Sequence, residues 1–382
     1  MTVRDVTTAE LPDWDATAVD APGGHVYQSR AWAEHRAASG WRPRFLGTDD
    51  DGRVLALERR WPFIGGGSAY VPRGPVPVGA DGATLAARQI AVADALAANG
   101  ADVVAADPEV PAEDTAFVAG IRAAGFRPIE EIQPSRHRIR LPLEDGVDEM
   151  LAFGHIAKST RQRIRAAEAS GLTVVRHDVR IGPDGAGEGF RPPVGSTDVA
   201  LDRFYDLLVA TGERRQFTFG PRDGFTSWWR RAHAAGHLVY LEVHEDGAGV
   251  AHDDVADGAG APAGPPLAGL VLYRHGGRLS TVHSGDRAET RRQHPGALHL
   301  ARWRAVQLAI REGCTEMDLG GADVSGARRR PVEGEPMWGL YQHKLSFGGQ
   351  WLELAGAHER VFRPRRYAAG RAVARVSRLI GR

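Results

Sequence analysis

Apolar positions in the first third of the chain change repeatedly between helical and strand spacing. Two apolar runs flank the turn sequence Asp-Asp-Asp-Gly at 49–52, and this pattern predicts a β-hairpin. Extended segments continue to about residue 143. The expected elements are helices over 29–39, 83–98 and 114–124, the hairpin over 42–62 and a strand over 101–108.

The second half repeats this order after a separate helical stretch. Apolar strand runs at 237–247 and 266–285 are separated by a long polar segment, and a helix ending at Gly313 follows them. The remaining expected elements are helices over 222–235, 297–312 and 339–346, a strand at 315–321 and another from 350. Two similar successions, in a chain of 382 residues, predict two related domains with mixed sheets flanked by helices, an α/β (α+β) fold. We expect residues 1–142 plus about 355–382 to form the first domain and 143–354 the second.

Three segments have less regular patterns. Residues 180–196 and 246–265 are rich in glycine, alanine and proline or aspartate, and we expect mobile loops there. Between the two successions, Ile156, Ile164 and Ala167 fall near one helical face while arginines at 161, 163 and 165 spread over the others. This helix is either a solvated connection or a cationic wall facing phosphates.

Composition excludes several classes of site. The formal net charge is zero, so binding to nucleic acid or to an anionic membrane requires a local patch. The single cysteine, Cys314, excludes an internal disulfide framework and is expected to pack as a small residue. No P-loop, HExxH or zinc spacing occurs, and His-Asp-Asp at 252–254 lies in a low-complexity loop that cannot hold ligands rigidly, so we expect no metal. The polar N-terminus and the lack of a long apolar run predict a cytoplasmic protein.

Lysine is almost absent from this chain. Of 48 basic residues only Lys158 and Lys344 are lysines. Because nearly every basic residue is an arginine, each lysine is either a chance residue or one whose compact ammonium a planar guanidinium cannot replace.

Several separated segments resemble the Fem family of tRNA-dependent aminoacyltransferases, which build the interpeptide bridge of peptidoglycan. The segments are YQSRAWAEHRAASGW from Tyr27, KSTRQRIRAAEASGLTV from Lys158, GERRQF from Gly212, HPGALHLARWRAVQLAIREGCTEMDLGG from His294 and GLYQHKLSFGG from Gly339. Each block alone is weak, but their order and spacing cover nearly the whole chain. No sustained heptad run is present, so the resemblance is to a member without the coiled-coil arm.

The resemblance implies tandem acyltransferase (GNAT-like) domains and a reaction in which an amine attacks the ester of an aminoacyl-tRNA. The acceptor would be a lipid-linked (lipid II) or UDP-linked muropeptide, with no cofactor beyond the tRNA co-substrate and a monomeric enzyme. Lys344 matches the family lysine and would stabilise the charge that develops on oxygen. Arg36 and Arg214 would bind the acceptor diphosphate through forked contacts. Asp107 would lie near the acceptor amine.

For several further candidate site residues, a purely structural role is the alternative. His343 and His283 replace a phenylalanine and a tyrosine of relatives, and are either proton carriers or packed rings. Tyr341, Lys158 and Arg161 lie in family blocks and would contact substrate. Asp107 could equally initiate a turn before Pro108, and a dedicated general base is not required.

Other functions are compatible with the same fold. A CoA-dependent N-acyltransferase would need a glycine-rich turn at a helix start, and the nearest match, from Gln293 to Leu298, contains a proline and ends in leucine. A non-catalytic muropeptide- or RNA-binding protein and a peptide-antibiotic synthase using aminoacyl-tRNA are further alternatives. The tail from Glu359 holds eight arginines and one acid; it would lie on anionic lipid at the inner face of the membrane, follow RNA phosphates or pack on the first domain.

Overall fold

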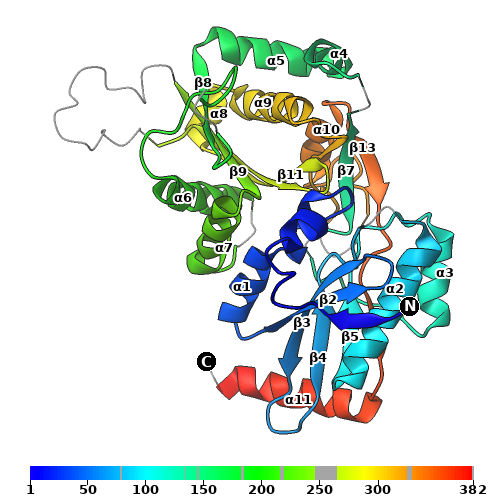
Figure 1. The fold of residues 1–382 in the computed structure, drawn as a ribbon. Helices are drawn as coiled ribbons and strands as arrows, with labels where there is room; N and C mark the ends of the chain where they lie inside the picture. The colour runs from blue at the N-terminus through cyan, green and yellow to red at the C-terminus, as the bar shows by residue number, and fades with distance from the viewer. Residues whose placement is uncertain are drawn as a thin grey trace.

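The structure of the chain is a computed structural model. It describes residues 1–77, 80–133, 135–143, 146–181, 185–215, 219–245, 265–324 and 329–380. Within these ranges the strands form two seven-stranded sheets, one in each half of the molecule (Figure 1).

The first sheet has the strand order β1-β2-β3-β4-β5-β14-β6. Its strands are β1 (Val3–Asp5), β2 (Arg42–Thr48), β3 (Arg53–Arg60), β4 (Gly67–Val71), β5 (Ala101–Ala106), β6 (Arg127–Pro128) and β14 (His358–Val361). The expected hairpin is confirmed as β2 and β3, which pair antiparallel around the 49–52 turn. Its helices are α1 (Arg30–Ala38), α2 (Gly82–Ala98), α3 (Thr115–Ala123) and α11 (Pro364–Ile380), with short helical turns η1 (Ala16–Asp20) and η2 (Val26–Gln28).

The second sheet has the order β13-β7-β12-β11-β10-β9-β8. Its strands are β7 (His137–Pro142), β8 (Leu172–His177), β9 (Leu238–Glu245), β10 (Ala268–His275), β11 (Arg278–Asp286), β12 (Glu316–Asp318) and β13 (Gln350–Glu353). Its helices are α4 (Glu149–His155), α5 (Lys158–Ala169), α6 (Thr197–Arg215), α7 (Arg222–Ala234), α8 (Ala288–Gln293), α9 (Ala297–Arg311) and α10 (Trp338–Leu345).

The two sheets repeat one plan. Each contains a single parallel pair among its described strands, β4 with β5 and β11 with β12. A long helix, α2 or α9, crosses between the two strands of each pair, as a parallel connection requires. The two related units expected from the sequence are therefore present as tandem GNAT-like halves.

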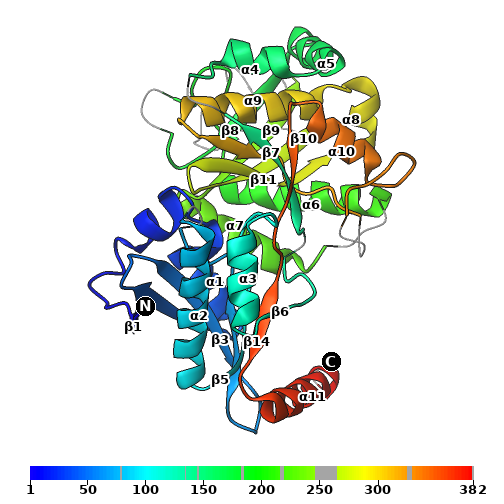
Figure 2. The ribbon, with the colours of Figure 1, turned by 90° about the vertical axis from the view of Figure 1, so that its right-hand side faces the viewer.

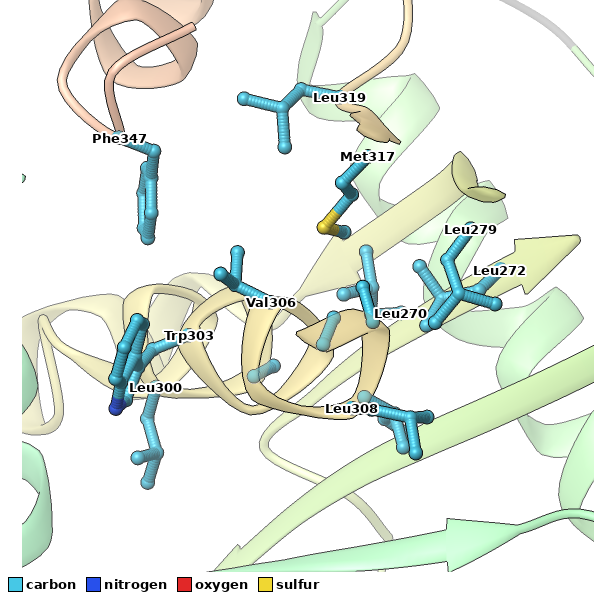
Figure 3. Packing of buried hydrophobic residues seen from close by; sticks show 14 of the residues in the cluster. Leu270, Leu272, Leu279, Leu300, Trp303, Val306, Leu308, Met317, Leu319 and Phe347 are labelled. Carbon is cyan, nitrogen blue, oxygen red and sulfur yellow. The ribbon is translucent and has the colours of Figure 1, made fainter. Parts of the chain in front are cut away.

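Helices and sheets alternate in layers. Helices α2 and α3 cover one face of the first sheet with the core around Leu85, Phe117 and Ile121. A middle layer of α1, α6 and α7 packs between the sheets, around Trp229 and Phe204. The outer face of the second sheet is covered by α5 and α9 (Figure 1). Side chains of α9 interdigitate with Leu270, Leu279 and Met317 of the sheet, and Phe347 closes this core from the α10 side (Figure 3).

Helix α5 is thus not a connection between domains, because Ile164 and Ala167 are buried against the second sheet. Segment 187–191 also lies against this sheet, since the Arg191 amide donates to the Val174 carbonyl at 2.8 Å. The expected loop at 246–265 lies almost wholly outside the described residues.

The chain crosses twice between the halves. The first crossing enters β7, which pairs with β12 and β13 in the second sheet, so this sheet begins before the expected boundary at residue 142. The second leaves β13 and enters β14, which lies between β5 and β6 of the first sheet. Figure 2 shows these segments running from one half to the other. Cys314 packs beside the core as expected, and burial raises the pKa of its thiol to about 11.

Candidate active site

The candidate site lies where the parallel strands of each sheet separate. Strands β4 and β5 pair as far as Val71 and Ala106, and β11 and β12 pair as far as Ser280 and Asp318. Beyond these positions the backbones diverge, and the carboxyl ends of parallel strands are where α/β folds place ligands. We call these positions the first and the second fork.

Asp107 is the central acid of the first fork. It is buried directly after β5, where the Tyr70 hydroxyl donates to both carboxylate oxygens at 3.0 Å and the Arg73 amide donates at 2.8 Å. Burial raises the pKa of Asp107 to about 6, although Arg73 and these donors act in the opposite direction. A carboxylate poised near neutral pH suits proton transfer.

Arg36 lies near the end of α1. Its guanidinium lies over the rings of Trp32 and Trp41, 5.4 Å from each centroid. Burial lowers the pKa of Arg36, and the Tyr70 hydroxyl opposes this shift. Its enclosed Nε has no hydrogen-bond partner, and no ion pair of Arg36 occurs within the described ranges. Tyr70 thus contacts Asp107 directly and acts on Arg36 through its electrostatic effect.

Lys344 is the central cation of the second fork. Its side chain is 6 % exposed, and Nζ donates to the Gly321 carbonyl at 2.7 Å. A Cβ at Gly320 would lie 3.1 Å from Nζ and 2.8 Å from the Thr281 carbonyl, so only glycine leaves this ammonium its room. The Thr281 hydroxyl, on the same fork, is buried without a hydrogen-bond partner.

Ser135 connects the two forks. Its carbonyl accepts from Arg73 Nη2 at 3.3 Å, and its Oγ donates to the His137 carbonyl at 2.5 Å. The side chain fills the space beside Gly321, where a Cβ would approach Oγ to 2.1 Å. Asp107 and Lys344, which are far apart in sequence, are thus linked through Arg73, Ser135 and Gly321.

A buried ion network crosses between the halves beside the forks. Glu109 of the first half forms an ion pair with Arg278 of the second, and lies 3.7 Å from His25 Nε2 and 3.9 Å from Arg73 Nε. Burial opposes ionisation of Glu109, but Arg278 and His25 outweigh it and hold its pKa well below the usual range. Arg138 continues the network to Glu316 at 2.7 Å.

His343 belongs to a separate group behind Lys344, which we call the cationic cluster: Arg163, His299, Arg302 and His343. The His343 ring meets the His299 ring edge-on at 4.5 Å, and Arg163 Nη1 lies 3.5 Å from His299 Nε2. Burial, reinforced by the neighbouring Arg302, lowers the pKa of His343 far below its ordinary value. A neutral, packed ring fits this geometry better than a proton carrier.

Arg302 is the most unusual member of this cluster. It is 2 % exposed, its Nε and Nη1 are enclosed without hydrogen-bond partners, and no carboxylate pairs with it in the described part of the chain. Burial lowers its pKa to about 10. A buried guanidinium without an anion is costly, and the contact that Arg302 does make is with the Phe347 ring, whose centroid lies 5.8 Å from Cζ.

Two predicted site residues are packing residues in this geometry. His283 faces Phe219, Phe225 and Trp229, and burial alone lowers its pKa to about 4. Tyr341 is buried between Trp338 and Trp351 in the core of the second half.

The structure places the remaining predicted residues on α5 and α6. Lys158 is exposed at the start of α5, two residues before Thr160, whose hydroxyl bonds Ser346 at the end of α10. Arg161 donates to the Gly154 carbonyl at 2.5 Å. Arg214 lies in the last turn of α6, and its side chain is outside the described part.

The sequence patterns did not single out Tyr70, Arg73, Glu109, Arg278 or Arg302. Only Arg73 had a local signal, since it lies in a Pro-Arg-Gly-Pro turn and has a positive φ of 52°. Among the described residues, no group of three or more His, Cys, Asp or Glu side chains could hold a metal ion. Nor does any helix within them have the length and apolarity needed to cross a membrane.

Comparison with known proteins agrees with this architecture. Residues 157–327 match the family described as Acetyltransferase (GNAT) domain. Over 246 residues the chain is 26% identical to the lipid II:glycine glycyltransferase of Staphylococcus aureus, a match that covers 61% of this chain and 51% of that protein. The chain therefore spans about half the length of the curated relatives it matches.

Two solved structures extend the comparison to the whole chain. The crystal structure of FemX superposes with a TM-score of 0.74 at 18% identity, covering 97% of this chain and 99% of that chain. The structure of L-PGS from Bacillus licheniformis gives 0.51 at 12% identity, covering 99% and 98%. The protein is thus similar in sequence to a lipid II glycyltransferase, and its two GNAT-like halves have the fold of FemX from end to end.

Proposed function

We propose that this chain is an armless Fem-type aminoacyltransferase, which moves an amino acid from aminoacyl-tRNA to the amine of a lipid- or UDP-linked muropeptide. The observation that carries the proposal is the position of Lys344, whose ammonium is enclosed at the second fork. The similarity to a lipid II:glycine glycyltransferase supports a peptidoglycan precursor as acceptor.

The reaction needs few groups. The acceptor amine attacks the ester carbonyl, a C–N bond forms, and the bond from the carbonyl carbon to the ribose oxygen breaks. Lys344 stabilises the negative charge on the carbonyl oxygen or on the departing ribose oxygen. Asp107 accepts the amine proton, the departing ribose oxygen takes up a proton from water to become a hydroxyl, and Arg36 binds the acceptor diphosphate.

The cationic cluster supports an anionic donor carrier. Arg302 and Arg163 approach His299 from α9 and α5, behind Lys344. We assign them to a phosphate of the tRNA acceptor end. No step of the chemistry passes through them; they hold the ester so that its carbonyl faces Lys344.

The direct test supplies labelled aminoacyl-tRNAs or acetyl-CoA to purified protein, each with UDP-linked and lipid-linked muropeptides. Label passing from tRNA to a muropeptide supports the proposal and identifies the donor. Acetylation from acetyl-CoA without transfer from tRNA would overturn it.

A CoA-dependent acyltransferase is the second candidate, favoured by the GNAT match. The start of α9 fits CoA pyrophosphate poorly. Pro295 lacks an N–H, and a Cβ at Gly296 would lie 2.4 Å from the Arg163 carbonyl, so α5 packs closely on this helix end.

Asp107→Asn tests the proton acceptor. Because burial raises the pKa of Asp107 to about 6, the base form increases as pH rises through 6, and kcat/KM of the wild type should fall about tenfold per pH unit below that value. In the variant, kcat/KM should no longer fall as the pH drops below 6, so the acid limb of the pH profile disappears. Its activity at neutral pH should be roughly 10²-fold lower than that of the wild type. A pH profile of kcat/KM from 5 to 8 measures both. An unchanged acid limb in Asp107→Asn would assign it to another group.

Arg302→Met tests the cationic cluster. Removing a buried charge that has no anion should leave the melting temperature unchanged or higher, since methionine fills a similar volume without a desolvation cost. The KM for aminoacyl-tRNA should rise roughly ten- to hundredfold, the loss expected for a charge-assisted hydrogen bond of roughly 1.5–3 kcal/mol. Thermal denaturation and initial rates provide the two readouts. A lower melting temperature with unchanged KM would make Arg302 a structural residue.

A further inference from the structure

The loop that joins β3 and β4, residues 61–66, projects an aromatic side chain into solvent. Phe63 is 96 % exposed, the most exposed large apolar side chain in the described part of the chain. It has a positive φ of 67°, and Gly65 and Gly66 follow with φ of 66° and 71°. A phenylalanine in the left-handed region is uncommon and strained, and such strain gathers at functional positions.

The base of this loop is fixed to α11. Trp61 Nε1 donates to Asp102 Oδ2 at 2.8 Å, and Arg366 of α11 binds Asp102 Oδ1 at 2.7–2.8 Å. A Cβ at Gly370 would lie 2.3 Å from the Trp61 ring, so the helix rests directly on it. Loop 61–66 and α11 lie side by side at the end of the first half in both ribbon views (Figures 1 and 2). Phe63 therefore has a defined place beside a basic helix.

The charge around Phe63 is positive and uncompensated. Arg60 precedes the loop, and Arg365 and Arg371 lie on α11; all three are exposed. None forms an ion pair within the described ranges, although Arg371 lies over the Tyr367 ring at 5.6 Å. The nearby acid Asp102 is buried and already bound by Arg366.

We propose that loop 61–66 and the adjoining face of α11 form a peripheral membrane-binding surface, in which Phe63 inserts into the acyl boundary and Arg60, Arg365 and Arg371 contact anionic lipid headgroups. An apolar tip surrounded by unpaired cations is the combination that binds such interfaces. The net charge of the chain is zero, so this local patch supplies the attraction.

The geometry fits a bilayer better than RNA. A stacking platform for bases lies flat on the protein surface, whereas Phe63 projects with nearly all of its surface free. The patch also belongs to the first half, while the cationic cluster assigned to tRNA lies on α5, α9 and α10 of the second (Figure 1).

Sedimentation of the full chain with vesicles tests this surface. We expect binding to phosphatidylcholine vesicles that contain phosphatidylglycerol and weak binding to phosphatidylcholine alone, with salt reducing the former. Phe63→Ser should weaken the affinity roughly tenfold, and Arg365→Gln or Arg371→Gln about fivefold each. Met150→Ser is the matched control, because Met150 is 80 % exposed on α4 of the other half and should bind like the wild type.

Vesicle binding is measured without donor or acceptor, so its outcome does not depend on the proposed reaction. Equal binding by wild type and Phe63→Ser, or no binding by either, would overturn the proposal. Loss of binding to unacylated tRNA in these variants, with vesicle binding retained, would make the surface a nucleic-acid site instead. If the proposed reaction is also correct, Phe63→Ser should slow transfer to a lipid-linked acceptor in vesicles and leave transfer to a UDP-linked acceptor unchanged.

Discussion

Lys344→Arg is expected to lower kcat for aminoacyl transfer by roughly two to three powers of ten, with little change in KM. The loss follows from charge placement: a donor aimed at a developing oxyanion contributes about 2.7–4 kcal/mol, and only in the transition state. Arginine keeps the charge, but its planar head is wider than the space left by Gly320 and the Gly321 carbonyl. Steady-state transfer from labelled aminoacyl-tRNA gives kcat and KM separately.

The other lysine of the chain provides the comparison. Lys158 is exposed at the start of α5, so a guanidinium can replace its charge without displacing a neighbour. Lys158→Arg should therefore have a far smaller effect than Lys344→Arg. Equal losses in the two variants, or wild-type kcat in Lys344→Arg, would contradict the assignment of Lys344.

Glu109→Gln is expected to destabilise the protein by roughly 3–5 kcal/mol at pH 7, because it removes the closer of the two carboxylates that pair with the buried Arg278 and leaves Glu316 at 3.8 Å. The pKa of Glu109 is held well below its usual range, so its stabilising contribution is complete above the ordinary carboxyl pKa and is lost as pH falls. Urea denaturation measures the free energy of unfolding of the wild type and of Glu109→Gln. The difference between the two should become smaller at acidic pH.

Two further variants sharpen this test. Glu10→Gln removes the exposed ion pair of Glu10 with Arg4 and should shift the urea midpoint little. Arg278→Met in the Glu109→Gln background should recover part of the loss, since it removes the buried guanidinium that has lost its closer carboxylate. A Glu109→Gln midpoint close to that of the wild type would show that the network does not hold the halves together.

Much of the fold could be predicted because its signals are local. The turn at 49–52 defined the first hairpin, and Gly313 marked the end of α9. Helix α6 was not predicted, although Ala200, Leu201, Phe204 and Leu208 have helical spacing. The strand β7 was assigned to the wrong sheet because strand pairing is a long-range property.

The residues of the candidate site likewise divide into those with a local sequence signal and those whose role depends on long-range contacts. Lys344 could be singled out from lysine scarcity and resemblance, and Asp107 from the strand that precedes it. The roles of Tyr70 and Glu109 depend on partners that only the folded chain brings close, such as Arg278 for Glu109. His343 and Arg302 are ionisable residues that the sequence shows directly, but it does not show that both are buried, and burial is what lowers the pKa of each.

The place of β14 has a consequence for synthesis on the ribosome. Residues 358–361 lie between β5 and β6, so the first sheet lacks an inner strand until β14 has been synthesised, after all the other strands. Until then β5 and β6 each expose an unpaired edge, while the second half can already assemble from β7 to β13. The first half is therefore the first to be translated and the last to complete its sheet. While β5 and β6 remain unpaired, chaperone binding to their edges would protect the nascent chain from aggregation.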